Sequence, residues 1–191
     1  IWVAGCSSLS RLGRDRHEFV RVNVPVSDSG CSVDGTVLAA TPDGSVWVGV
    51  TNGDLYRVDR SERITRFRPG EESTKQLPGG RVKALLVDAK GRLLIASGKG
   101  LARYENGKFA RVGEDVLAGV PIGALSKDSK GRIWIGSEEG LYYLTDKDAY
   151  KRAPWPMAAN SRNAIVERDQ GGGYWIGSSD GLHRIDSYGH E

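Results

Sequence analysis

The chain has 191 residues, of which 39% are hydrophobic and 27% are charged, and it carries a formal net charge of +3. These values fit an ordinary soluble globular protein. Basic and acidic residues are interspersed, without the clustered basic stripe and interleaved aromatics that bind nucleic acid, so we expect no nucleic-acid partner. No apolar run approaches the roughly 18 residues that a membrane-spanning helix needs.

The chain begins within a predicted strand. Its first four residues, Ile1-Trp2-Val3-Ala4, are all apolar, and neither an initiator Met nor a signal peptide precedes them. We therefore expect a piece of a longer polypeptide, with any targeting or membrane segment outside it. The abundance of glycine, 26 residues, favours many turns and therefore many short strands.

An internal repeat of about 43 residues is the dominant feature of the sequence. Each copy has an apolar anchor residue, with Gly three positions before it in the four complete copies. The anchors are Trp2, Trp47, Leu94, Trp134 and Trp175. A second glycine follows six residues after each of the last four anchors, at Gly53, Gly100, Gly140 and Gly181.

The third copy predicts the strands of one unit. Residues 82–87 form a mostly apolar inner strand, 93–96 a second strand and 101–104 a third, each separated from the next by a glycine-containing turn. Asn106-Gly107 is a strong hairpin signal, and 108–112 alternates as an outer strand. Each repeat is therefore predicted to be a four-stranded antiparallel meander.

A lone sheet of this kind cannot bury both faces, whereas a ring of stacked sheets can. We predict an all-β fold of β-propeller blades: four complete or nearly complete blades and a partial one, in a single repeat domain that is a slice of a larger ring. Closure into a small ring is the alternative. Trp47, Trp134 and Trp175 are expected at equivalent, buried inter-blade positions. The predicted blade units are 1–24 (partial), 36–68, 81–112, 121–153 and 162–191.

The repeat reads Asp-x-x-Gly-x-(Leu/Ile/Val)-Trp-(Ile/Val)-Gly-(Ser/Thr)-x-x-Gly-Leu-x-Arg, and residues 128–143 and 169–184 match it most fully. It resembles the two-component regulator propeller repeat. The resemblance implies the periplasmic input domain of an inner-membrane bacterial sensor, whose output domain is a hybrid histidine kinase or a diguanylate cyclase outside this segment. Because the repeat residues of that family are structural, the resemblance implies no catalytic residue.

Candidate chemistry is sparse. The three histidines, His17, His183 and His190, do not fall at metal-ligand spacing, so we expect no metal site and no cofactor. The acidic residues Asp88, Asp128 and Asp169 recur once per repeat, as structural turn residues do.

A propeller lyase of the streptogramin-lyase type is the enzymatic alternative. Such an enzyme needs a His and a Glu, for which His183 and Glu167 are the candidates.

Trp155 breaks the repeat. It lies between two prolines, in the loop between one outer strand and the next inner strand, and binding residues favour such loops. We predict that Trp155, Asn160 and Arg162 contribute to a rim that contacts a ligand or partner; the alternative is that Trp155 folds back as a lid on its blade. Cys6 and Cys31 are either two separate thiols or one disulfide.

The sequence therefore favours a non-catalytic, extracytoplasmic signal-input and ligand-binding segment. Expected partners are a carbohydrate or another extracellular small molecule, the remaining propeller blades or another sensor segment, and a second copy in a homodimer. A protein-interaction scaffold is a further alternative to the lyase.

Overall fold

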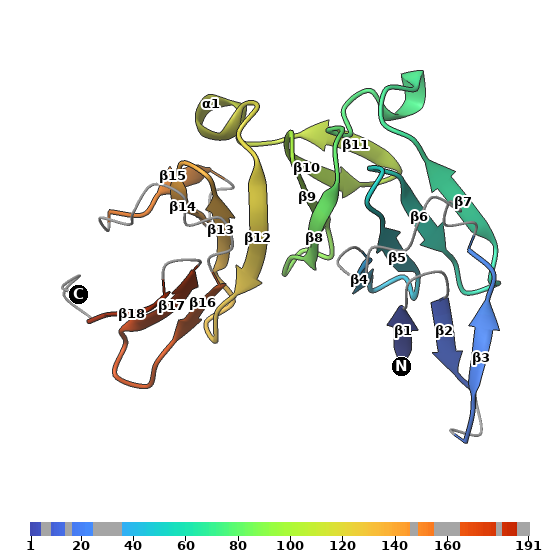
Figure 1. Cartoon of the computed structure of the whole chain (residues 1–191), viewed down its shortest axis with the longest axis horizontal. Helices are drawn as coiled ribbons and strands as arrows, with labels where there is room; N and C mark the ends of the chain where they lie inside the picture. Colours follow the sequence, from blue (N-terminus) through green and yellow to red (C-terminus); the bar gives the residue numbers. More distant parts are fainter. Residues whose placement is uncertain are drawn as a thin grey trace.

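The computed structural model describes residues 1–4, 9–13, 17–24, 36–145, 149–154, 165–178 and 181–186. Its strands form five antiparallel sheets, three with four strands and two with three, each a meander in chain order. The sheets stand next to one another in an arc (Figure 1). This arrangement confirms the predicted all-β fold of propeller blades.

We number the sheets as blades 1 to 5 in chain order. The three-stranded blades at the two ends are β1 (Trp2–Ala4), β2 (Leu9–Leu12) and β3 (Phe19–Val22) in blade 1, and β16 (Ile165–Arg168), β17 (Tyr174–Ser178) and β18 (Gly181–Ile185) in blade 5.

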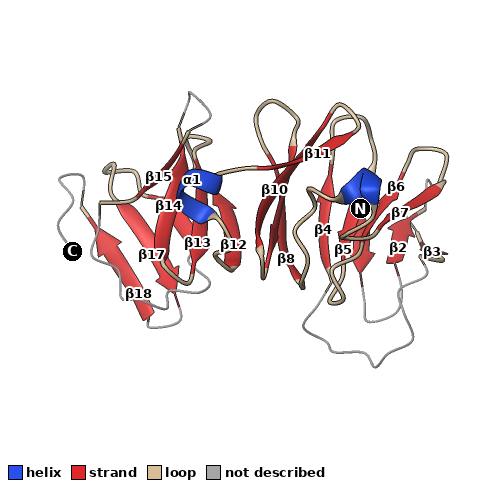
Figure 2. Cartoon of the chain, turned by 90° about the horizontal axis from the view of Figure 1, so that it is seen from above, coloured by secondary structure: helices blue, strands red, loops and turns tan. Residues whose placement is uncertain are grey.

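The interior blades are four-stranded. They comprise β4 (Val37–Ala40), β5 (Val46–Gly49), β6 (Leu55–Val58) and β7 (Ile64–Phe67) in blade 2; β8 (Val82–Val87), β9 (Leu93–Ser97), β10 (Gly100–Glu105) and β11 (Lys108–Arg111) in blade 3; and β12 (Ile122–Lys127), β13 (Ile133–Ser137), β14 (Gly140–Leu144) and β15 (Tyr150–Arg152) in blade 4. Short helical turns, η1 (Glu72–Thr74) and α1 (Glu114–Leu117), lie between blades 2 and 3 and between blades 3 and 4 (Figure 2).

The first strand of each blade lies on the inside of the arc. Strand β8 contacts both β4 and β12, and β12 also contacts β16. Blade 1 begins with the equivalent of a second strand, because β1 carries the anchor Trp2. The described part of blade 5 ends with the equivalent of a third strand.

Aspartates fix the turn between the first and second strands. In blade 3 the backbone N–H groups of Lys90 and Arg92 both donate to Asp88 Oδ1, at 2.9 Å. Asp128 accepts the same pair of bonds in blade 4, and in blade 5 Asp169 accepts one from Gly173. The recurring acidic residues therefore close turns, as their spacing predicts.

The repeat glycines adopt backbone conformations that side chains disfavour. The φ angles at Gly53, Gly100, Gly140 and Gly181 are +91°, +123°, +133° and +142°. At Gly53 a Cβ atom would also lie 2.7 Å from the carbonyl oxygen of Gly80, where blade 2 meets the entry to blade 3. This position needs glycine both for its left-handed backbone and for the close approach of a second chain segment.

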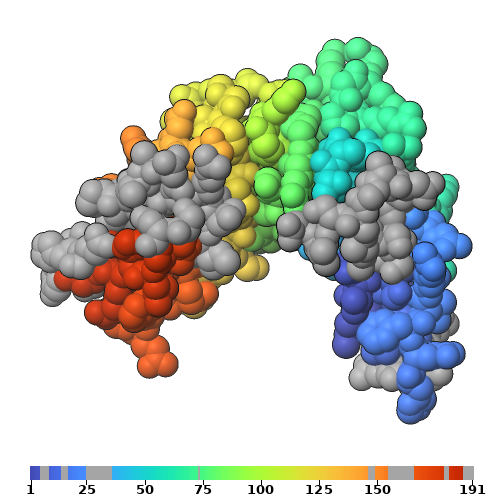
Figure 3. Space-filling model, in the orientation of Figure 1, coloured from blue at the N-terminus to red at the C-terminus, as the bar shows by residue number. Residues whose placement is uncertain are grey.

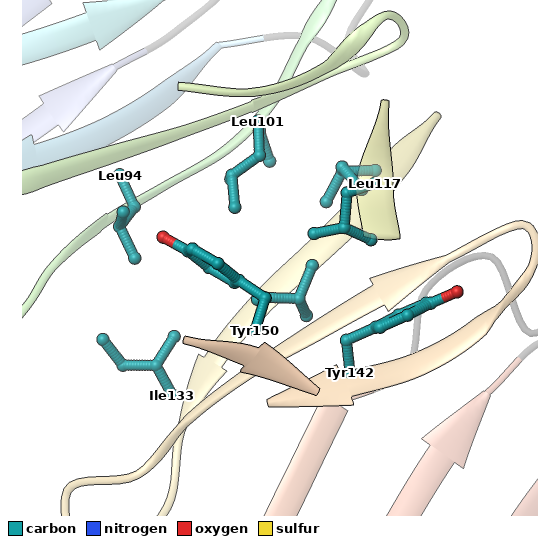
Figure 4. Packing of buried hydrophobic residues seen from close by; sticks show 9 residues of the cluster. Leu94, Leu101, Leu117, Ile133, Tyr142 and Tyr150 are labelled. Carbon is teal, nitrogen blue, oxygen red and sulfur yellow. The ribbon is translucent and has the colours of Figure 1, made fainter. Parts of the chain in front are cut away.

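The second strand of each interior blade is buried on both faces. In blade 4, Ile133 and Ile135 pack towards blade 3 with Leu94 and Leu101, in the cluster drawn in Figure 4. Trp134, between the two isoleucines, packs the other way, against blade 5. The anchor side chain of each blade thus faces the blade that follows it.

Aromatic contacts reinforce the boundary between blades 2 and 3. Trp47 stacks on Phe67 with ring centroids 5.5 Å apart and meets Tyr104 of blade 3 edge-on at 4.6 Å. Phe109 of blade 3 meets Phe67 at 5.2 Å. Offset and edge-to-face arrangements of this kind add to the stabilisation from buried area.

Trp175 does not share the burial expected for it. Trp47 and Trp134 are 1% exposed, whereas Trp175 is 41% exposed. The reason is that its face points to where a sixth blade would stand, and no described sheet lies there. Leu182, on the same face, is 69% exposed, and Val3, on the outer face of blade 1, is 49% exposed.

The two end blades stand apart in the space-filling view (Figure 3), so the described residues form an open arc and not a closed ring. Both outer faces expose apolar side chains of a type that the interior boundaries bury.

An aromatic residue follows each of the first four anchors in the sequence, at Phe19, Phe67, Phe109 and Tyr150, but Phe67 is not in the register of the other three. Phe19, Phe109 and Tyr150 pair across the sheet with equivalent residues of the third strands, Leu12, Tyr104 and Leu144. The residue in that register in blade 2 is Ile64, which pairs with Val58. Phe67 lies three residues further along and pairs with Leu55. The side chain of Phe67 therefore faces the following blade, whereas the side chains of the other three aromatic residues face the preceding side.

Among the described residues, no helix is both long and apolar enough to traverse a bilayer.

Candidate functional site

Within the described part of the chain, two pockets open between neighbouring blades, at equivalent places. Groove A, of about 500 Å³, lies between blades 2 and 3 and is lined by the β4–β5 turn, the β8–β9 turn and the β10–β11 hairpin. Groove B, of about 410 Å³, lies between blades 3 and 4 and is lined by the β8–β9 turn, the β12–β13 turn and the end of β14. The β8–β9 turn is the wall between them, and it contributes Lys90 and Arg92 to both.

Groove A has charged groups of both signs. Asp43 pairs with Arg57, with Nη2 and Oδ2 2.7 Å apart, and accepts hydrogen bonds from the Thr41 hydroxyl at 2.6 Å and the Ser45 N–H at 2.9 Å. Partial burial opposes ionisation, but these bonds and the charge of Arg57 outweigh it and lower the pKa of Asp43 to about 2. The guanidinium of Arg57 also lies 5.8 Å from the centre of the Trp47 ring.

Groove B is more strongly basic. Among its described lining residues, four side chains are basic, and the one carboxylate, that of Asp88, is paired with Arg92. The Arg92 Nε and Asp88 Oδ2 atoms are 2.5 Å apart, and the two side chains are only 7% and 3% exposed. The basic side chains that reach solvent around this buried pair are Lys90, Lys130 and Arg132.

The turn arginines of blades 3 and 4 have different partners, and the difference follows the anchor residue of each blade. In blade 4 the indole Nε1 of Trp134 donates to Asp128 Oδ2 at 3.0 Å, so the turn carboxylate is engaged by the anchor. Leu94, the anchor of blade 3, has no such donor, and Arg92 binds the equivalent oxygen of Asp88 instead.

Arg132 consequently leaves the turn and reaches over side chains that pack against blade 5, away from groove B. Its guanidinium is 5.2 Å from the centre of the Tyr143 ring and 5.8 Å from that of Trp134. Tyr143 stands where the other blades have an arginine opposite the anchor, as Arg184 stands opposite Trp175. In blade 4 the cation over the anchor tryptophan thus comes from the turn residue Arg132, whereas in blades 2 and 5 it comes from an arginine of the third strand.

An equivalent ion pair occurs in blade 5, on its exposed side. Arg184 donates to Asp169 Oδ2 at 2.9 Å and lies 5.8 Å from the centre of the Trp175 ring. The hydrogen bond from Arg184 is the largest influence on Asp169 and lowers the pKa of this carboxyl.

No cluster of three or more His, Cys, Asp or Glu side chains that could bind a metal ion occurs in the described part of the chain. His17 lies exposed just before β3, and His183 lies on β18. His190, Cys6 and Cys31 fall outside the described residues.

The candidate lyase pair does not converge. His183 pairs across the sheet with Ile176, whereas Glu167 pairs with the adjacent Trp175, so the two side chains leave opposite faces of the blade. Glu167 accepts a hydrogen bond from the backbone N–H of Ser129, in the turn of blade 4, at 3.1 Å.

The predicted rim residues Trp155, Asn160 and Arg162 lie outside the described residues, so their role stays a prediction. The grooves instead use first-to-second-strand turns, which the sequence analysis treated only as structural. A usable signal was present: Lys-Gly-Arg occurs at 90–92 and again at 130–132, in the same register of consecutive repeats.

Comparisons with solved structures agree on the fold. The extracellular domain of the hybrid two component system BT3049 from B. thetaiotaomicron is 19% identical, with a TM-score of 0.68 over 97% of this chain and 27% of that one. Virginiamycin B lyase from Staphylococcus aureus is 15% identical, with a TM-score of 0.66 over 96% of this chain and 61% of that one. PorZ, a surface component of the type-IX secretion system of Porphyromonas gingivalis, is 15% identical, with a TM-score of 0.68 over 100% and 26%.

This chain therefore spans about three fifths of the lyase and about a quarter of the other two proteins. At these identities the likeness establishes the propeller fold. No curated protein matches the chain.

One segment of the chain also matches a family of repeats. Residues 117–139, from the end of α1 through β13, match the family described as "Two component regulator propeller". The same register of anchor and glycine recurs in the neighbouring blades, as the sheet pairing shows. Residues 117–139 are thus similar to the two component regulator propeller repeat, and the solved structures show that the chain as a whole has the propeller fold.

Proposed function

We propose that this chain is a signal-input and ligand-binding segment of a bacterial two-component-type sensor, in the periplasmic part of an inner-membrane protein, and that the segment itself is not catalytic. Its repeat family and its structural likeness to extracellular domains of hybrid two component systems support this role. The observation that carries the ligand-binding part is the pair of grooves at consecutive blade boundaries.

A ligand in such a groove would contact two blades at once. It would favour the relative position of the blades in which it binds best, and a ligand shifts an equilibrium only by its difference in affinity for the two states. Binding would therefore alter blade packing, which a connected domain can detect. The apolar outer faces of blades 1 and 5 would receive further blades, another sensor segment or a second copy of the chain.

A melting experiment tests ligand binding directly. The chain is heated with a panel of neutral and acidic mono- and oligosaccharides, and a ligand of the native state raises the melting temperature by mass action. Lys90→Trp would obstruct both grooves, since Lys90 lines each of them. Lys151→Trp, on the exposed outer strand β15, is the matched control.

We expect at least one saccharide to stabilise the wild type and the Lys151→Trp variant, and to lose this effect with Lys90→Trp. If no ligand stabilises the wild type, or if both variants retain the effect, groove binding by this segment is wrong.

The enzymatic alternative has its own test. Virginiamycin B lyase shares the fold, and a catalytically inactive form of that enzyme has been solved with quinupristin. We expect intact quinupristin to persist when it is incubated with this chain and followed by chromatography, because His183 and Glu167 leave opposite faces of blade 5. Consumption that His183→Ala abolishes would make the chain a lyase.

A further inference from the structure

We propose that the outer face of blade 5 binds the outer face of blade 1 in a second copy of this chain, in a head-to-tail contact. The proposal rests on the proposed function, in which these two faces receive a partner, and it names that partner. The carrying observation is that the two faces match, register by register, the two sides of the boundaries between the five described blades.

One side of each boundary, the anchor side, is built by the anchor and by a leucine of the third strand. This leucine pairs with the residue two positions after the anchor, so it shares the face of the anchor. In blades 1 to 4 it is at most 3% exposed and belongs to the cluster that fills the boundary with the following blade. The four leucines are Leu9, Leu55, Leu101 and Leu141.

The other side of each boundary, the receiving side, belongs to the following blade. It includes the residue directly after the anchor of that blade, which is at most 1% exposed in blades 2 to 5. These residues are Val48, Ile95, Ile135 and Ile176. The outer-strand aromatic residues Phe109 and Tyr150, each 8% exposed, belong to the same side.

Blade 5 presents an anchor side that no described sheet covers. Leu182 pairs with Gly177, two positions after the anchor Trp175, and so it has the register of the four buried leucines. Nevertheless Leu182 is 69% exposed and Trp175 is 41% exposed. The face therefore has the composition of an anchor side but lacks a receiving side.

Blade 1 presents a receiving side in the same condition. Val3 directly follows the anchor, as Ile135 does in blade 4, and Phe19 has the register of Tyr150. Val3 is 49% exposed and Phe19 is 52% exposed, whereas their counterparts in blade 4 are 0% and 8% exposed. Within one chain the two faces do not meet, because blades 1 and 5 stand apart (Figure 3). A second copy supplies each face with the side it lacks.

A contact between unlike faces fits better than a contact between two like faces. At the boundary between blades 4 and 5, the anchor Trp134 packs with Ile176 and meets the ring of Tyr174 edge-on at 5.2 Å. Two anchor sides placed together would instead bring two Arg184 guanidinium groups, each lying over its own Trp175, onto one small interface. Like charges placed against each other in this way disfavour association.

A head-to-tail contact leaves one free face at each end of a dimer, so it permits longer assemblies as well. The interface is small, and the described residues of blade 1 include no first strand to complete it. We therefore expect a weak association that depends on protein concentration.

Sedimentation velocity from low micromolar to near-millimolar concentration tests the proposal. Val3→Glu places a charge in the receiving side of blade 1, and Leu182→Glu places one in the anchor side of blade 5. Both positions are exposed, so the added carboxylate does not enter the core. Thr65→Glu, exposed on the outer strand of interior blade 2, is the matched control. Melting curves verify that all three variants fold like the wild type.

We expect the average mass of the wild type and of Thr65→Glu to rise above the 20.7 kDa of one chain as the concentration increases. Val3→Glu and Leu182→Glu should each associate with themselves at least about tenfold more weakly, because the contact would bury an unpaired carboxylate. An equimolar mixture of these two variants should associate again and stop at two copies. Each variant keeps the face that the other has lost, and only one intact pair of faces can form.

A wild type that stays monomeric over the whole range would overturn the proposal. Association of either variant alone, as strong as that of the wild type, would overturn it too, because it would indicate a contact between two like faces. A mixture that stays monomeric would also contradict the head-to-tail pairing. None of these measurements involves a saccharide, so stabilisation of the wild type in the panel described above would uphold the ligand-binding role even if this inference fails.

Discussion

Blades 4 and 5 carry almost the same motif, yet they use it differently. Trp134 of blade 4 is 1% exposed and Trp175 of blade 5 is 41% exposed, although both occupy the same register. The difference lies in the neighbour and not in the motif, because blade 5 covers Trp134 and no described sheet covers Trp175. In a stacked-repeat protein the interface between repeats, more than the repeat itself, supplies the burial.

Truncation of the two tryptophans tests the difference between blades 4 and 5 most directly. Trp134→Ala should lower the free energy of unfolding by about 3–5 kcal/mol, because it removes a fully buried aromatic side chain and leaves a cavity. Trp175→Ala should lower it by less than about 1 kcal/mol, since half-exposed side chains away from the core change stability little. Urea denaturation followed by circular dichroism measures both, and equal losses would contradict the stacking of blades 4 and 5.

The turn ion pairs extend the comparison to electrostatics. Asp88→Asn should destabilise the chain by about 3 kcal/mol, because it leaves Arg92 buried without its counter-charge. The same change at Asp169 should have a much smaller effect, because its partner Arg184 is half exposed and can be solvated. Thermal melting of the two variants at neutral pH compares them. A larger loss at Asp169 would contradict the interior role of the Asp88–Arg92 pair.

Glycine substitutions test the same difference, between an interior blade and an end blade, in the backbone. Gly53→Ala should cost about 2–3 kcal/mol, since a Cβ would combine a φ of +91° with a 2.7 Å approach to Gly80. Gly181→Ala, with a φ of +142° and nothing within 4 Å of its Cβ, should cost only the backbone strain, about 1 kcal/mol. Chemical denaturation of both variants separates the steric effect from the conformational one. Equal losses in the free energy of unfolding would contradict the close contact at Gly53.

The smallest expected effect is the pH dependence of the stability that Asp43, in groove A, contributes to the folded state. The pKa of Asp43 is lowered to about 2 from its ordinary value of 3.8, so its ionised form stabilises the folded state above about pH 4, and this stabilisation is lost as the pH falls towards 2. Because the side chain is half exposed, we expect a contribution of at most about 1 kcal/mol. The difference in melting temperature between wild type and Asp43→Asn should therefore shrink between pH 5 and pH 2; a constant difference would contradict the pairing with Arg57.

Much of the fold could be predicted from the sequence because the repeat is periodic and its glycines mark the turns. The exposure of Trp175 could not be predicted, because the burial of an anchor side chain depends on a neighbouring blade, which the repeat motif does not specify. The register of Phe67 could not be predicted for a similar reason. Aromatic residues recur at comparable spacing, but only the strand pairing reveals that Ile64 occupies the equivalent place in blade 2.

The candidate site was harder to predict than the fold. The sequence drew attention to Trp155 because it breaks the pattern, whereas the grooves are built by residues that keep to it. Lys90 and Lys130 lie in turns that look purely structural within one blade, and their joint role appears only when two blades are packed together. A basic pair repeated in register is a signal that can be sought in other arrays of this kind.

The central claim is that each anchor is sequestered by the blade that follows it. Hydrogen exchange at the tryptophan indole N–H groups, measured by nuclear magnetic resonance with single Trp→Phe variants for assignment, tests it residue by residue. The account predicts slow exchange for Trp134, whose Nε1 donates to Asp128 inside the boundary with blade 5, and fast exchange for Trp175. Fast exchange at Trp134, or equal protection of the two indoles, would contradict it.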